Sequence, residues 1–64
     1  MKARELRELS VEELLKRLDQ SLQELVNLRI QSAVGKSSNP SRVREVRRTI
    51  ARVKTILAER GVRV

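Results

Sequence analysis

The sequence predicts an all-α fold, an antiparallel two-helix hairpin with helices at about residues 10–34 and 40–60, preceded by a short N-terminal helical turn. In two long segments apolar residues recur every three or four positions, which is the period of an α-helix with one buried face. Helix start and stop signals frame both segments, and turn-forming residues separate them. Because a short turn makes consecutive helices antiparallel neighbours, we expect one small helical domain covering residues 1–64.

The first residues form a short segment ahead of the hairpin. The stretch from Ala3 to Leu9 contains no helix breaker, so we expect it to add one helical turn. Leu6 and Leu9 are then expected to pack across the open end of the hairpin.

Three local signals mark the start of the first long helix. Ser10 is a favourable N-cap, and Glu13, three residues later, completes a capping box. Leu9 before the cap and Leu14 after it have the pattern of a hydrophobic staple. At the other end, Gly35 suits the left-handed position that follows a helix. Between these limits we predict one buried stripe, formed by Val11, Leu14, Leu15, Leu18, Leu22, Leu25, Val26, Ile30 and Ala33.

The second long helix has equally clear limits. Asn39 is a favourable N-cap, Pro40 fits the first helical position, and Gly61 ends the helix after about residue 60. Its stripe is expected to pack against the first as in a short coiled coil, and it consists of Val43, Val46, Ile50, Val53 and Leu57. Leu18, Leu22, Ile50 and Val53 are predicted core positions whatever the function.

The positive charge is concentrated in the second half of the chain. The net charge is +7, and residues 35–64 hold nine basic and two acidic side chains, whereas residues 1–34 are close to neutral. Most of the basic residues are arginine, whose planar guanidinium can bind phosphate and stack on bases. This asymmetry favours a polyanionic partner, and the alternative is a basic surface that only maintains solubility.

Helical geometry places this charge on one side of the second helix. With 100° per residue and Val43 at 0°, the apolar stripe spans about 280° to 0°. Five cations occupy the neighbouring half of the cylinder, and Glu45 falls just outside it. A helix that needed only solubility could mix both signs on this surface. The pattern therefore favours a nucleic acid over an acidic protein, a lipid surface or plain solvation, with contacts through Arg44, Arg47, Arg48, Arg52 and Lys54.

Several residue types needed for catalysis are missing. Without His, Cys or Tyr the chain lacks the usual general base, the commonest metal ligand and further nucleophiles. It has no Gly-rich phosphate loop, and two helices enclose no substrate pocket, so we expect no enzyme, small-molecule substrate, metal or cofactor. Phe and Trp are also absent, so RNA binding would depend on phosphate contacts and shape. We expect a cytoplasmic protein, because neither a membrane span of roughly 20 apolar residues nor a signal-peptide core is visible.

Two motifs at a fixed separation resemble one protein family. Asn27-Leu28-Arg29-Ile30-Gln31, then Gly35, then the run VRRTIARVKT from Val46 to Thr55, are similar to the universal large-subunit ribosomal protein twenty-nine, the eukaryotic thirty-five. The opening MKARELR is also similar to the start of that family, so the resemblance covers nearly the whole chain. The Asn39-Pro40 turn resembles archaeal members more than bacterial ones, and residues 36–41 are the least typical part.

The resemblance implies a structural constituent of the large ribosomal subunit, whose helical hairpin lies on large-subunit rRNA near the exit of the nascent-peptide tunnel. It implies the universal large-subunit protein twenty-three as a neighbour, and neither catalysis nor a cofactor. By position in the family motifs, it implies RNA contacts at Lys2, Arg4, Arg7, Arg29, Gln31, Arg47, Arg48, Arg52, Lys54 and Thr55.

Each of these contacts has a simpler alternative within the protein. Arg29 can pair with Glu24 or Gln31, Arg44 can pair with Glu45, and the N-terminal cations can belong to a loose tail. For the whole chain, the alternative function is a helical protein–protein interaction module, such as a coiled-coil adaptor or dimer, without a role in RNA binding. A membrane-surface helix fits less well, because the apolar stripe lacks Trp and Phe.

Overall fold

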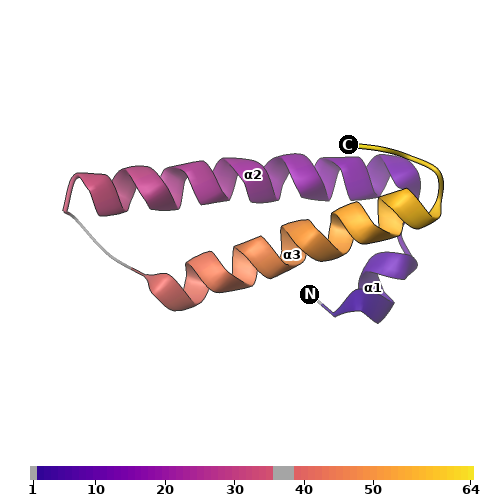
Figure 1. The fold of residues 1–64 in the computed structure, drawn as a ribbon, viewed down its shortest axis with the longest axis horizontal. Coiled ribbons are helices and arrows are strands. Elements are labelled where there is room, and N and C mark those ends of the chain that lie inside the picture. The colour runs from indigo at the N-terminus through magenta and orange to yellow at the C-terminus, as the bar shows by residue number, and fades with distance from the viewer. Residues whose placement is uncertain (1, 36–38) are drawn as a thin grey trace.

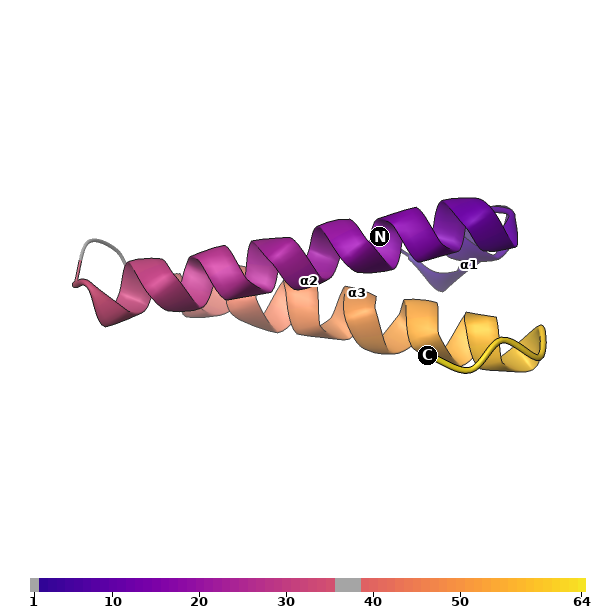
Figure 2. The same cartoon turned by 90° about the horizontal axis from the view of Figure 1, so that it is seen from above.

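The computed structural model describes residues 2–35 and 39–64. Over these residues the chain forms three helices and no strand: α1 (Ala3–Arg7), α2 (Val11–Ala33) and α3 (Pro40–Glu59). Helices α2 and α3 run side by side in opposite directions, and α1 lies against the C-terminal half of α3 (Figure 1). The two long helices also stay close in the perpendicular view of this body of 40 × 18 × 14 Å (Figure 2). The predicted hairpin with its N-terminal helical turn is confirmed.

The start of α2 confirms Ser10 as the N-cap. The Ser10 hydroxyl accepts a hydrogen bond from the Glu13 backbone N–H at 3.2 Å and donates one to the Glu13 carboxylate at 3.1 Å. The predicted capping box is therefore only half formed, because the Glu13 carboxylate binds the Ser10 hydroxyl where the box would have it bind the backbone N–H. Leu14 is buried and Leu9 packs against the same cluster, in line with the predicted staple.

The other predicted helix limits are confirmed as well. The Asn39 side chain accepts from the Arg42 backbone N–H at 3.2 Å, and Pro40 occupies the first helical position. Gly35 and Gly61 follow α2 and α3 with φ of 73° and 81°, in the left-handed region that favours glycine. Beyond Gly61, the Val62 backbone N–H reaches back to the Leu57 carbonyl at 2.8 Å, as in a Schellman motif. Residues 36–38 of the predicted turn lie outside the described residues, as does residue 1.

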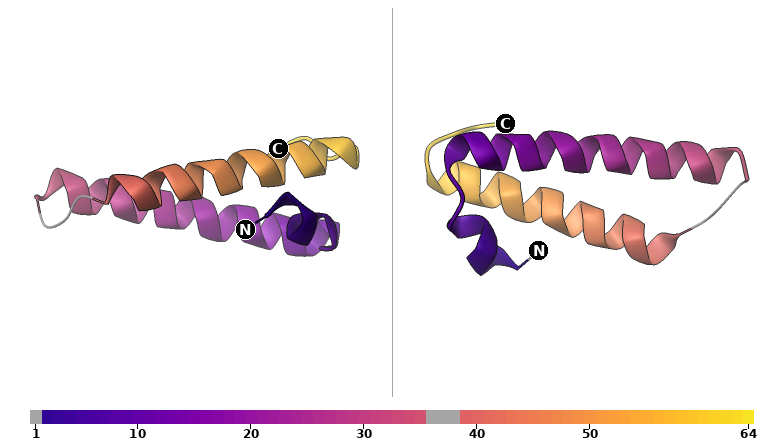
Figure 3. Two further views of the ribbon diagram at one scale, coloured as in Figure 1. Left: turned by 90° about the horizontal axis from the view of Figure 1, so that it is seen from below. Right: turned by 180° about the vertical axis from the view of Figure 1, so that it is seen from behind.

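The core lies toward one end of the hairpin, where all three helices meet. We name this the closed end; it comprises α1, the N-terminal half of α2 and the C-terminal half of α3 (Figure 3). The core side chains extend from there to the middle of the hairpin and are Leu6, Leu14, Leu18, Val46, Ile50, Val53, Ile56 and Leu57. The predicted stripe of α3 is thus confirmed, except that Val43 is only half-buried and Ile56 joins the core.

Two arginines attach α1 to the C-terminal part of α3. The Arg60 guanidinium donates to the backbone carbonyl of Arg7 at 2.6 Å and to that of Leu9, so it caps the end of α1. The Arg7 guanidinium pairs with the Glu59 carboxylate at 3.2 Å. Leu6 is fully buried between the helices, and the predicted packing of Leu6 and Leu9 across the end of the hairpin opposite the turn is confirmed.

The prediction that all apolar positions of α2 form a single buried stripe is wrong. Leu14 and Leu18 are buried, but Leu22, which the sequence predicts as core, is 42% exposed. Around the helix the predicted set covers roughly 160°, whereas one partner helix covers about 100°. Helix α3 covers one edge of the set and leaves the other in solvent. We call the uncovered edge the apolar ridge; it consists of Leu15, Leu22, Val26 and Ile30.

At the opposite end of the hairpin, the turn end, an ion pair links the two long helices. Arg42 of α3 donates from Nε and Nη2 to the two carboxylate oxygens of Glu24 of α2, at 2.6 and 2.8 Å. It also donates to Glu45 at 3.3 Å. The hydrogen bonds from Arg42 lower the pKa of the Glu24 carboxyl below its usual 4.5. Because Arg42 occupies both carboxylates, neither the Arg29–Glu24 nor the Arg44–Glu45 pairing considered from the sequence forms.

Candidate nucleic-acid interface

The basic face of α3 is formed by Arg44, Arg47, Arg48, Arg52 and Lys54. All five side chains are exposed, because they leave α3 away from the stripe that packs on α2. Within residues 2–35 and 39–64, no ion pair engages four of these five cations, namely Arg44, Arg47, Arg48 and Lys54. The one-sided arrangement predicted from the helical angles is therefore present on the surface.

Both acidic residues of α3 are held by arginines that lie outside the basic face. Glu45 accepts from Arg42, and Glu59 accepts from Arg7. Their carboxylates therefore pair with cations that lie outside the basic face.

The N-terminal cations extend this surface from a neighbouring element. Lys2 and Arg4 are exposed at α1, which is docked against α3 and is not a loose tail. Arg7 is also exposed, with 58% of its side chain accessible, but it already pairs with Glu59. Folding thus brings cations from the start of the sequence next to α3.

Arg29 and Gln31 lie apart from this surface, near the C-terminal end of α2. Both side chains are exposed. Residues two positions apart on an α-helix are separated by about 200° around its axis, so these two side chains leave α2 on opposite sides. One flat RNA surface can meet only one of them.

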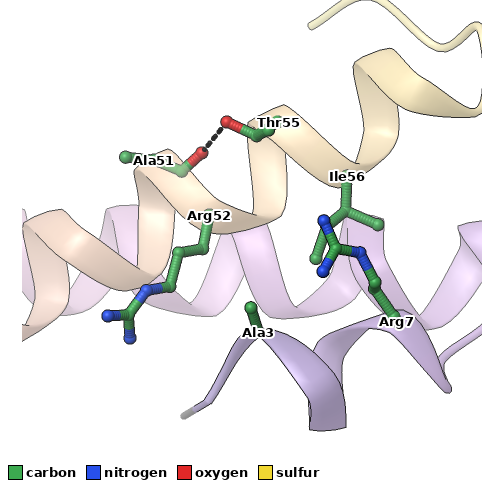
Figure 4. A pocket seen from close by; sticks show the side chains of 6 residues that line it. All are labelled: Ala3, Arg7, Ala51, Arg52, Thr55 and Ile56. Atoms are coloured by element: carbon green, nitrogen blue, oxygen red, sulfur yellow. Dashed lines mark hydrogen bonds between the residues drawn. The ribbon is translucent and has the colours of Figure 1, made fainter.

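Three residues implied by the sequence meet in a groove between α1 and α3. Arg7, Arg52 and Thr55 come from these two helices and line a groove of ≈ 170 Å³ (Figure 4). The Thr55 hydroxyl donates to the Ala51 carbonyl of its own helix at 2.9 Å. The remaining lining residues are Ala3, Ala51 and Ile56. Sequence reasoning missed this apolar lining, because no periodicity in the sequence predicts where a five-residue helix docks.

The structural roles of Arg42 and Arg60 and the exposure of the apolar ridge were not predicted from the sequence. Arg42 and Arg60 are cations with structural partners, the first across the turn end and the second at α1. The apolar ridge was assigned to the core, although the width of the apolar set in α2 was a signal that one partner helix cannot cover it.

The charged groups suit an anionic partner. Arginine forms two parallel hydrogen bonds with phosphate, and the basic face presents four such side chains. In the described part of the chain, no group of three or more acidic, His or Cys side chains is placed to hold a metal ion. Among the described helices, none is long and apolar enough to span a bilayer.

Comparison with known proteins places this chain beside one family. A family model described as Ribosomal L29 protein matches residues 4–60. The large ribosomal subunit protein uL29 of Thermoanaerobacter sp. (strain X514) is 60% identical over 65 residues, which cover 98% of this chain and 94% of that protein. The uL29 protein of Caldanaerobacter subterraneus subsp. tengcongensis is 60% identical over 60 residues, covering 94% of this chain and 91% of the relative.

A third relative extends over the complete chain. The uL29 protein of Natranaerobius thermophilus is 52% identical over 64 residues, which cover 100% of this chain and 98% of that protein. These relatives are bacterial, so the archaeal resemblance suggested by the Asn39-Pro40 turn is not supported. A favourable N-cap followed by Pro is a general helix start, and it therefore distinguishes lineages poorly.

Proposed function

This chain belongs to the ribosomal L29 protein family, and from that premise we propose how it contacts its partners. It is a structural constituent of the large ribosomal subunit of the cytoplasmic ribosome, with ribosomal RNA and ribosomal proteins as partners, and it is not an enzyme. We propose that the basic face of α3 is its main contact with large-subunit rRNA, extended by Lys2 and Arg4 at the docked α1.

The observation that supports this most directly is that, among the described residues, no ion pair neutralises four of the five cations of the basic face. Arg44, Arg47, Arg48 and Lys54 lie on the exposed side of one helix, and both carboxylates of that helix are held by other arginines. Arg44 and Arg48 are four residues apart and therefore lie next to each other on the helix surface. Their like charges repel, which lowers the stability of the free helix. Phosphates that lie across this face offset that repulsion.

The residue types favour contacts with the RNA backbone and its shape. Arginine supplies planar pairs of N–H donors for phosphate oxygens. The chain has no aromatic ring on which to stack a run of bases. Arg29 and Gln31 leave α2 on opposite sides, and we propose that they meet different RNA segments, away from the basic face.

The apolar ridge of α2 supports a second contact, with protein. Val26 and Ile30 are each 55% exposed, and a side chain of this kind gains little from a phosphate backbone. We propose that a neighbouring ribosomal protein covers this ridge, and that the neighbour is the universal large-subunit protein twenty-three, near the exit of the nascent-peptide tunnel. A ridge that instead drove self-association of the free chain would give a mass that rises with concentration in sedimentation equilibrium.

Salt-dependent binding to deproteinised large-subunit rRNA tests the proposed contact. Arg47→Gln combined with Arg48→Gln removes two cations of the basic face, and Lys16→Gln combined with Arg17→Gln removes two adjacent cations of α2 as the matched control. Each lost phosphate contact lowers the slope of log affinity against log salt by roughly 0.7–0.9, so the first variant should lose about 1.5. The control should keep the wild-type slope, with the helicity of both variants verified by circular dichroism. Equal slopes in the two variants would contradict the proposal.

A further inference from the structure

We propose that the groove between α1 and α3 receives a single unpaired nucleotide of the bound RNA, with its base against the apolar lining and the Arg7 guanidinium. This inference builds on the proposed RNA-binding function and specifies a second kind of contact. The basic face holds phosphates, whereas the groove holds one base.

The shape of the groove fits one planar ring system. Its walls come from helices at opposite ends of the sequence, with Ala3 below Ala51 and Ile56 in the close view (Figure 4). Its volume is ≈ 170 Å³. A protein cavity of about 150 Å³ accommodates a benzene ring, so one base fits at this scale and a helical strand does not.

The floor of the groove is chemically suited to a base rather than to a phosphate. Ala3 and Ala51 contribute methyl groups, and Ile56 is a nearly buried core residue whose exposed edge faces the groove. An anion placed on such a floor loses water without gaining hydrogen bonds. A nucleobase loses little hydration free energy when one of its faces is placed there, because its faces are apolar.

Arginine takes the role that aromatic rings have in other RNA-binding proteins. Unpaired bases stack on aromatic side chains or on guanidinium planes, and this chain has only the latter. Glu59 holds the Arg7 guanidinium through contacts of 3.2 and 3.3 Å, which restrain its plane beside Ile56 (Figure 4). Stacking on Arg7 leaves that ion pair intact, because the base approaches the face of the guanidinium and not its N–H groups.

Two polar groups complete the site. The Thr55 hydroxyl donates its hydrogen bond to the Ala51 carbonyl, so its oxygen lone pairs can accept from an amino group or a ribose 2′-hydroxyl. The Arg52 guanidinium lies at the other end of the groove from Arg7 (Figure 4), where it can attract the phosphate of the same nucleotide.

Filling the groove tests the proposal without changing any charge. Ala51→Leu places a larger side chain in the groove, and Ala58→Leu makes the same change on the exposed surface of α3 outside it. Leucine is almost as good a helix former as alanine, so both substitutions are compatible with α3. The probe is deproteinised large-subunit rRNA, with affinity measured across salt concentrations and base accessibility measured with dimethyl sulfate and a carbodiimide.

The expected result separates the groove from the basic face. Ala51→Leu should weaken binding on the order of tenfold, as loss of one stacked base does, with a salt slope lowered by no more than the one phosphate contact at Arg52, roughly 0.7–0.9. One unpaired nucleotide, protected by the wild-type chain and by Ala58→Leu, should become reactive with Ala51→Leu. Identical protection and affinity in both variants would overturn the groove proposal and leave the other proposed RNA contacts in place.

A second variant keeps the test decisive if Ala51→Leu alters the fold. Arg7→Lys preserves the charge and the pairing with Glu59 but removes the planar stacking surface. It should lose the same nucleotide protection as Ala51→Leu, and retained protection would overturn the role of Arg7. A wild-type chain that shows no salt-dependent binding to the rRNA would overturn both this proposal and the function beneath it, which is a different outcome from a failure of the groove alone.

Discussion

The closed end and the turn end of this hairpin differ in the number of helices that pack together. At the closed end, three helices surround Leu6, Leu14, Val53 and Leu57, and none of these side chains has measurable exposure. Toward the turn end, only α2 and α3 face each other, and Val26 and Ile30 remain more than half exposed while Arg42 and Glu24 join the helices. At the closed end α1 packs against α3 and adds Leu6 to the core, whereas among the described residues no third helix packs on the hairpin at the turn end.

This difference also separates stability from binding. The closed end holds the buried apolar area from which a small domain derives its stability. The ridge and the basic face lie outside that core, so they can meet partners without unfolding it.

The largest expected effect is a contrast between two leucines of α2. Leu14→Ala empties a fully buried site at the closed end and should cost about 2–5 kcal/mol, which leaves a domain of this size largely unfolded. Leu22→Ala removes a side chain that is 42% exposed and should cost less than about 1 kcal/mol. Urea unfolding followed by circular dichroism measures both, and equal costs would remove the distinction between core and ridge.

The next effect concerns the attachment of α1. Arg60→Gln removes the guanidinium that caps the Arg7 and Leu9 carbonyls, and it should cost about 1–2 kcal/mol, localised at the closed end. Hydrogen exchange should accelerate at the amides of α1 and remain slow in the middle of α2. Arg63→Gln, a nearby exposed arginine, serves as control. If α1 stays equally protected in the Arg60 variant, Leu6 packing alone holds it.

A smaller effect is expected on the ridge. Val26→Gln should change the free energy of unfolding by no more than about 0.5 kcal/mol, because the side chain already lies in solvent. Thermal unfolding of the free chain provides the measurement. A loss as large as that of Leu14→Ala would show that the ridge is packed in solution, and self-association would then be the explanation to examine.

The smallest effect is the pH dependence of the ion pair at the turn end. The pKa of Glu24 is lowered by Arg42, so the pair contributes stability above the usual carboxyl pKa of 4.5 and loses it as pH falls through the lower folded-state value. Glu24→Gln should therefore be slightly less stable than the wild type at neutral pH and equally stable in strong acid. Both groups are exposed, which keeps the difference small. A stability gap between Glu24→Gln and the wild type that persists in strong acid would exclude this origin.

Local signals predicted the helices because capping is a local event. Ser10, Asn39, Gly35 and Gly61 act within one turn of their own position, and each has the predicted role. The basic face was also predictable, since angles around one helix need no knowledge of the rest of the fold.

Tertiary contacts were less predictable for a physical reason. The sequence shows that α2 is apolar over a wide arc, but not which edge of that arc its partner covers. Leu22 was therefore assigned to the core, although it lies on the ridge. Likewise, the pairing of Arg42 with Glu24 joins residues 18 positions apart, and the groove joins α1 to α3 across most of the chain. Which residues become such partners is determined by how the helices pack and cannot be predicted from the spacing of residues along the sequence.

The most direct test of the central claim is site-specific crosslinking in assembled large subunits. The chain has no cysteine, so Arg44→Cys on the basic face and Val26→Cys on the ridge each provide one attachment point for a benzophenone label. The account predicts that the label at position 44 crosslinks to rRNA and that the label at position 26 crosslinks to a protein. RNA crosslinks at position 26 together with none at position 44 would contradict the assignment of α3 to RNA and of the ridge to protein.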